Sequence, residues 1–199
     1  MYARENLPEG YAEIMSVDLQ KDKRLALWVN LAGAVIMVAM GAVMCFFKPL
    51  TLLADVSEDF FLSFLLRFGV LMLGMFLYIL LHEAVHGVFM KAFGAKELRF
   101  GFTGLYAYAG APATYFAKGA YLVIALAPVV LWGIVLGVLN PLVPDGWFWV
   151  VYLIQIFNVS GAVGDFYVTL RFLRLPRDIL VRDTGVAMTV FAPSEDSEE

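Results

Sequence analysis

Four long apolar segments constrain this chain more than any other feature of its sequence. They cover residues 25–47, 68–90, 119–139 and 147–170. About 20 consecutive helical residues cross the hydrocarbon core of a bilayer. Hydrophobic residues make up 61% of the chain and charged residues only 16%, whereas soluble domains are about half apolar and a quarter charged. The sequence therefore predicts an all-α, multi-pass membrane protein built as a bundle of about four transmembrane helices.

The charged residues between these segments predict how the chain crosses the membrane. Lys and Arg collect in residues 1–24, between the second and third segments, and after the fourth, whereas the other two loops are mostly acidic. Cytosolic loops of membrane proteins are enriched in Lys and Arg. We therefore expect both termini in the cytosol, with a leader at 1–24, a membrane-embedded domain at 25–175 and a tail at 176–199. The leader is too long and too acidic for a signal peptide, which predicts an uncleaved first helix.

The loop between the second and third segments has its own pattern. Residues 97–108 combine aromatic residues, partial alternation and a Thr-Gly turn signal, which favours a short β-hairpin. The loop is too apolar for a solvated connector, so we expect it at the cytosolic membrane face or between helices.

Outside the apolar segments the chain has no basic patch with interleaved aromatics, so nucleic acid is not an expected partner. Membrane lipids are, and the sequence leaves the oligomeric state open.

The second apolar segment contains His82-Glu83-Ala84-Val85-His86. Histidines four residues apart on a helix share one face and can bind one metal ion. Imidazole nitrogens suit Zn²⁺, and a catalytic zinc keeps three protein ligands and a water. The metal lowers the pKa of that water, so that Glu83 could take its proton and later deliver it to a leaving amine.

The same five-residue pattern also arises by chance, so its surroundings matter. An ionisable side chain near the middle of a membrane span costs about 2.5–3.5 kcal/mol on insertion scales, and the only two histidines of the chain both lie in this motif. These facts favour a metal site. A non-catalytic protein with a structural zinc is the alternative, but structural sites usually fill all four positions, and neither cysteine nor further histidine is available for that. Metal transport is less favoured, because the first and third segments are almost entirely apolar.

Carboxylates are the candidates for the third ligand. Asp165 lies in the fourth segment at a depth similar to that of His86, and nearby small residues would let this helix approach its neighbour. Asp183 is the rival, although the chain would have to fold back to bring it close. Asn158 could hydrogen-bond the substrate or an oxyanion, or could join two helices. Tyr78, one turn before His82, could support that ligand or pack as an aromatic side chain.

These features resemble known membrane peptidases. Residues 81–87, the β-like loop and the Asn158…Asp165 stretch are similar to the site-2 protease class of intramembrane zinc metalloproteases. They are more closely similar to the putative zincin peptidase family of small prokaryotic membrane proteins, whose pattern also includes residues 182–185. The resemblance implies that His82, His86 and Asp165 bind zinc and that Glu83 is the catalytic base. It also implies a membrane-anchored protein or peptide substrate and a location in a prokaryotic cell membrane.

Overall fold

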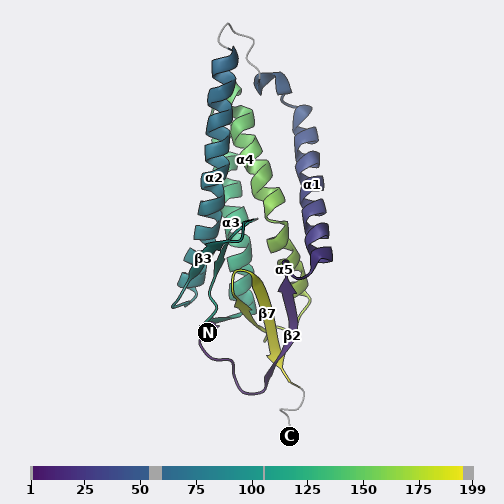
Figure 1. Ribbon diagram of the computed structural model, residues 1–199, viewed down its shortest axis with the longest axis vertical. Coiled ribbons are helices and arrows are strands. Elements are labelled where there is room, and N and C mark those ends of the chain that lie inside the picture. The colour runs from purple at the N-terminus through teal and green to yellow at the C-terminus, as the bar shows by residue number, and fades with distance from the viewer. Residues whose placement is uncertain (1, 54–59, 105, 195–199) are drawn as a thin grey trace. The chain divides into compact units, whose positions relative to one another are not determined.

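The computed structural model describes residues 2–53, 60–104 and 106–194 (Figure 1). Four of its helical segments are long and apolar enough to cross a membrane, consistent with a multi-pass membrane protein. The first three are α1 (Lys23–Cys45), α2 (Phe60–Ala92) and α3 (Lys118–Leu139). The fourth contains the 3-10 turn η2 (Asp145–Trp147), α4 (Phe148–Gly161) and α5 (Val163–Leu173). Ala162 separates α4 from α5, with φ −81° and ψ 12°.

The chain forms two compact units, which are described separately. The sheet unit comprises Met1–Trp28, Glu83–Pro128 and Gly164–Glu199, and the helical unit comprises Val29–His82 and Val129–Val163.

An antiparallel sheet of five strands organises the sheet unit, in the order β1-β5-β6-β7-β2. Its strands are β1 (Ala3–Arg4), β2 (Tyr11–Asp18), β5 (Tyr115–Ala117), β6 (Leu180–Asp183) and β7 (Ala187–Pro193). In Figure 1, β2 and β7 run side by side, and Tyr11 is opposite Pro193. The predicted all-α fold omitted this sheet, because three of its four strand pairings join segments that are far apart in sequence, and only β6 and β7 are neighbours along the chain.

The core of the sheet unit lies where the sheet meets the ends of the helices. Phe116, Val181 and Val190 from the sheet pack with Ile124 of α3 and Phe172 of α5, and all five are almost completely buried. Burying a side chain of this size contributes about 1.5–3 kcal/mol relative to leaving it in water. This core fixes the ends of α3 and α5 against β6.

A second, two-stranded sheet follows α2 in the chain. It pairs β3 (Arg99–Phe102) with β4 (Ala107–Gly110), with Phe100 opposite Ala109. These strands overlap residues 97–108, where the sequence predicted a hairpin. Gly110 lies very close to the turn after β6, because a Cβ atom built on it would be 2.4 Å from the backbone nitrogen of Gly185.

The helical unit depends on close approach at small residues. A Cβ atom at Gly33 of α1 would lie 2.8 Å from the carbonyl oxygen of Ser160, and one at Gly74 of α2 would lie 2.7 Å from Ile154. Small residues allow membrane helices to approach in this way. The 3-10 turn η1 (Leu50–Leu53) follows α1, and Trp149 of α4 donates a hydrogen bond to the carbonyl of Pro49 beside it.

Candidate metal centre

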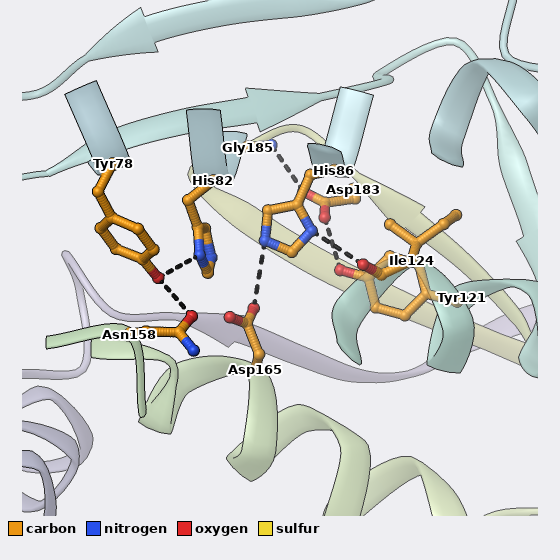
Figure 2. Close-up of polar contacts among 9 residues, drawn as sticks. All are labelled: Tyr78, His82, His86, Tyr121, Ile124, Asn158, Asp165, Asp183 and Gly185. Carbon is orange, nitrogen blue, oxygen red and sulfur yellow. Dashed lines mark hydrogen bonds and ion pairs between the residues drawn. The ribbon is translucent and has the colours of Figure 1, made fainter. Parts of the chain in front are cut away.

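His82 and His86 lie one turn apart on α2, so their side chains leave the helix on one face. The helix runs without Pro through both positions and consists mostly of Leu, Phe, Met and other apolar residues. Figure 2 shows Asp165, from the first turn of α5, with its carboxylate next to the imidazole of His86. In the part of the chain that the structure describes, His82, His86 and Asp165 form a group whose potential ligand atoms lie within 4.8 Å of one another.

The dimensions of this group fit a zinc ion. The Nε2 atom of His86 lies 3.7 Å from Oδ1 of Asp165. Two ligand atoms at ordinary zinc distances in a tetrahedral site are about 3.4 Å apart. Two imidazole nitrogens and one carboxylate oxygen are also a donor set found in catalytic zinc sites, which keep the fourth position open. The negative charge of Asp165 is further favoured at the start of a helix.

The orientation of His86 is set by a backbone carbonyl of α3. Its Nδ1 atom lies 2.9 Å from the carbonyl oxygen of Ile124. A carbonyl can only accept a hydrogen bond, so the neutral imidazole carries its proton on Nδ1 and keeps the lone pair on Nε2. Nε2 is the nitrogen that faces Asp165. Outer hydrogen bonds of this kind orient metal-binding histidines and raise their basicity.

His82 has a side-chain partner at the same position of its ring. Its Nδ1 atom lies 2.8 Å from the hydroxyl of Tyr78, which donates a hydrogen bond to Oδ1 of Asn158 at 2.9 Å (Figure 2). The sequence suggested two roles for Asn158, a contact with substrate or an interhelical hydrogen bond. Its side chain is completely buried and also donates to the carbonyl of Val129 on α3. This geometry is that of an interhelical hydrogen bond.

A small cavity of about 120 Å³ lies beside these ligands within the sheet unit. Glu83, His86 and Asp165 line it, together with residues 107–109 of β4 and the side chains of Tyr121 and Asp183. The predicted base and two predicted ligands therefore face one space. A larger cavity of about 600 Å³ lies in the helical unit, but none of the predicted site residues lines it.

Asp183, the rival for the third ligand, has other partners. Its Oδ2 accepts a hydrogen bond of 2.5 Å from Tyr121, and its Oδ1 accepts one of 2.7 Å from the backbone N–H of Gly185. Burial raises the pKa of Asp183 from 3.8 to about 6, and the charge of Asp165 acts in the same direction, although both hydrogen bonds lower it. The group with metal-ligand spacing contains Asp165 and not Asp183.

Two residues of the site were not predicted from the sequence. Tyr121 was not singled out because it is one of several aromatic residues in apolar segments. Ile124 contributes only its backbone carbonyl, which its side chain does not reveal. Pro128 inside the third apolar segment was the available signal, because it deprives the carbonyl four residues earlier of its helical hydrogen bond.

A family model described as "Putative zincin peptidase" matches residues 75–180, more than half of the chain. The matched range contains His82, Glu83, His86 and Asp165 and ends within β6. No curated protein and no solved structure matches the chain.

Proposed function

This chain belongs to the putative zincin peptidase family, and we propose that it is a membrane-embedded zinc metallopeptidase that cleaves peptide bonds near the cytosolic membrane face. The family supports a metallopeptidase. The observation that carries the proposal is the arrangement of Glu83 in one cavity with His86 and Asp165, whose ligand atoms lie close to that of His82. The basic residues in the last turns of α2 and α5 support a site near the cytosolic face of the membrane.

In this proposal His82, His86 and Asp165 hold the metal through Nε2, Nε2 and a carboxylate oxygen. A bound zinc would lower the pKa of water towards neutrality and polarise the carbonyl of a peptide bond. The Nδ1 hydrogen bonds of both histidines support this use of Nε2.

Glu83 acts as the general base and later as the general acid. It takes one proton from the attacking water while the water oxygen bonds to the carbonyl carbon of the substrate. It then gives that proton to the amide nitrogen as the carbon–nitrogen bond breaks, which yields a carboxylic acid and an amine. Glu83 follows His82 directly and lies three residues before His86 on α2. Its side chain lines the same cavity as that of His86.

The outer edge of β4 suits an extended substrate. The backbone N–H of Thr103 donates to the carbonyl oxygen of Tyr106, the residue that it would face if the register of β3 and β4 continued, so these residues occupy the position of a hydrogen-bonded pair. Such pairs alternate with non-hydrogen-bonded ones in an antiparallel ladder. The peptide groups of Ala107 and Ala109 therefore point away from β3, and both residues line the cavity that Glu83 lines.

A substrate strand added to this edge would gain backbone hydrogen bonds beside the proposed zinc site. Peptide bonds in a helix are shielded by their own hydrogen bonds, so an extended segment is the form that this site can cleave. We propose a membrane-anchored protein or peptide, unwound near the cytosolic surface, as the substrate. The surrounding membrane lipids would hold it at that depth.

The direct test compares the wild-type protein with Glu83→Gln in liposomes. Two probes are used: fluorophore-labelled casein, and a single-span model peptide with a labelled juxtamembrane segment. We expect the variant to bind one zinc per chain and to lose cleavage by at least about 100-fold, the lower end of what a general base contributes. Glu97→Gln is the matched control, because Glu97 is exposed and lies outside the cavity.

The result also separates the two functions considered from the sequence. Equal cleavage by wild type and Glu83→Gln would remove Glu83 from the mechanism. If the wild type binds zinc and cleaves neither probe, while His82→Ala lowers the thermal unfolding temperature strongly, a structural metal site would be the better description.

A further inference from the structure

Tyr78 and Asn158 form a hydrogen-bonded chain that ends on the imidazole of His82. Both lie within the helical unit, Tyr78 on α2 and Asn158 on α4, with exposed fractions of 6% and 0%. We propose that they are positioning residues that keep the proton of neutral His82 on Nδ1 and so present Nε2 to zinc. This inference rests on the proposed function only in assigning His82 as a zinc ligand.

The carbonyl of Val129 determines which atom donates and which accepts in each of these hydrogen bonds. It lies 3.1 Å from Nδ2 of Asn158 and can only accept a hydrogen bond. The amide nitrogen of Asn158 must therefore face Val129, with Oε1 of Gln155 as a second acceptor at 3.5 Å. The amide oxygen is then the atom that faces Tyr78.

The next two bonds follow from the first. The oxygen of Asn158 only accepts, so the single hydroxyl hydrogen of Tyr78 is donated to it over 2.9 Å. The phenol oxygen is left to accept a hydrogen bond from Nδ1 of His82, 2.8 Å away. A neutral imidazole has one N–H, so Nε2 of His82 carries the lone pair.

Packing holds the chain of bonds in this arrangement. The ring of Tyr78 packs edge-on against Phe157 and Trp132, with centroid distances of 5.8 and 6.4 Å. Gly133 of α3 lies beside the buried amide, since a Cβ atom built there would be in ordinary contact with Nδ2 of Asn158, at 3.6 Å. These neighbours restrict both side chains, so water cannot readily replace either partner.

The donor and acceptor roles in these hydrogen bonds lead to a specific prediction about Asn158. Without its amide oxygen, the hydroxyl of Tyr78 loses its acceptor and can donate to Nδ1 of His82 instead. The imidazole proton then moves to Nε2, the nitrogen that should bind zinc. Asn158→Ala should therefore weaken zinc binding more than Tyr78→Phe does, although Asn158 is the more distant residue. Removing the hydroxyl as well should relieve this effect.

Zinc affinity of the purified protein tests this by competition with a chelator. We expect Tyr78→Phe to bind zinc about 10- to 100-fold more weakly than wild type, as for other outer partners of metal ligands. Asn158→Ala should be weaker still, and the double variant should recover to the level of Tyr78→Phe. Tyr152→Phe is the matched control, because it removes an interhelical hydrogen bond of the same unit, from Tyr152 to the carbonyl of Met40, and should leave zinc affinity unchanged.

Nitrogen-15 NMR of labelled histidine provides a readout that a purely structural role would not move. The chain has two histidines, so the spectrum of the metal-free protein contains only His82 and His86. It is recorded about two pH units above the ordinary imidazole pKa of about 6.5. We expect both rings to be protonated at Nδ1 in wild type, and one ring to change to Nε2 in Asn158→Ala.

The outcomes separate this inference from the proposed function. A wild type that binds no zinc would overturn the proposed metal site, while the metal-free spectra would still decide whether Tyr78 and Asn158 set the proton position. A wild type that binds zinc, with unchanged affinity in Tyr78→Phe and an unchanged proton position in Asn158→Ala, would overturn the inference alone.

Discussion

The Nδ1 atom of His86 hydrogen-bonds to the carbonyl oxygen of Ile124, 2.9 Å away on α3. In a regular helix that carbonyl accepts the N–H of the residue four positions later, which here is Pro128. Proline has no N–H, so the carbonyl is available to the imidazole. A proline inside α3 thus leaves the carbonyl of Ile124 available to a proposed zinc ligand.

Replacing Pro128 with Ala should therefore weaken the metal site while it strengthens the helix. The new N–H would compete with His86 for the carbonyl of Ile124. We expect zinc affinity to fall about 10-fold, the lower end of the loss seen when a hydrogen-bond partner of a metal ligand is removed. The helix should gain, because Pro is disfavoured in a helix interior by about 3 kcal/mol. Chelator competition and thermal unfolding of the same preparation would measure the two effects.

Gly137→Ala provides the control for this experiment. It also favours the helical state of α3, and beyond its chain neighbours and the backbone of α3 itself its new Cβ atom would have no atom within 4 Å. Its zinc affinity should equal that of wild type. An equal fall in both variants would show that a stiffer α3, and not the carbonyl of Ile124, is responsible.

Exchanging the carboxylates of Asp165 and Asp183 for amides should decide which of them binds zinc. We expect Asp165→Asn to bind zinc more than about 100-fold more weakly, a larger effect than that of an outer partner, because a neutral amide replaces a charged ligand. Asp183→Asn should retain one zinc per chain. Metal content and chelator competition are the measurements, and the reverse order of the two variants would favour Asp183 as the ligand.

The raised pKa of Asp183 predicts how stability depends on pH. Burial raises this pKa from 3.8 to about 6, so the folded protein holds a proton that the unfolded chain releases. The stability gained from this proton is complete below about pH 3.8 and is lost as the pH rises through about 6. Stability falls wherever the native state binds more protons than the unfolded state.

Asp183→Asn removes this titration and should gain stability over wild type as the pH rises from 4 to 7. At 1.36 kcal/mol per pKa unit, the relative gain is on the order of 2–3 kcal/mol. Denaturant unfolding of the metal-free proteins in detergent would measure it. Infrared titration should also show a protonated carboxyl band with a midpoint near pH 6 that the variant lacks. A constant stability difference across this range would contradict the assignment.

The proposed role of β4 predicts an effect on substrate binding without an effect on zinc. Ala107→Pro removes an N–H that points to the outer edge of β4, so KM should rise while zinc affinity stays unchanged. Phe102→Pro removes the equivalent N–H from the other edge, since Phe102 is opposite Ala107 in the same non-hydrogen-bonded pair. Casein cleavage would compare the two, and equal KM values would argue against strand addition at β4.

The sequence determined the features that depend on neighbouring residues. Hydropathy over about 20 residues predicted the four spans, which the structure contains. The spacing of His82 and His86 predicted a shared face, because residues four apart on a helix always lie one above the other. The aromatic, partly alternating loop at 97–108 predicted a hairpin, and the structure pairs β3 with β4 antiparallel, while the predicted place of this loop at the cytosolic face or between helices stays a prediction. The roles of Glu83 and the ligands remain predictions.

Only the tertiary structure decided the relations between distant segments. Tyr11 pairs with Pro193, and no local pattern encodes that partner. The proximity of Asp165 to His86, and the different partners of Asp183, depend on how the sheet unit packs. The proton positions of the two imidazoles depend on a carbonyl of α3 and an amide of α4. Local rules fix what each segment can form, whereas these contacts follow from the free energy of burying all the segments together.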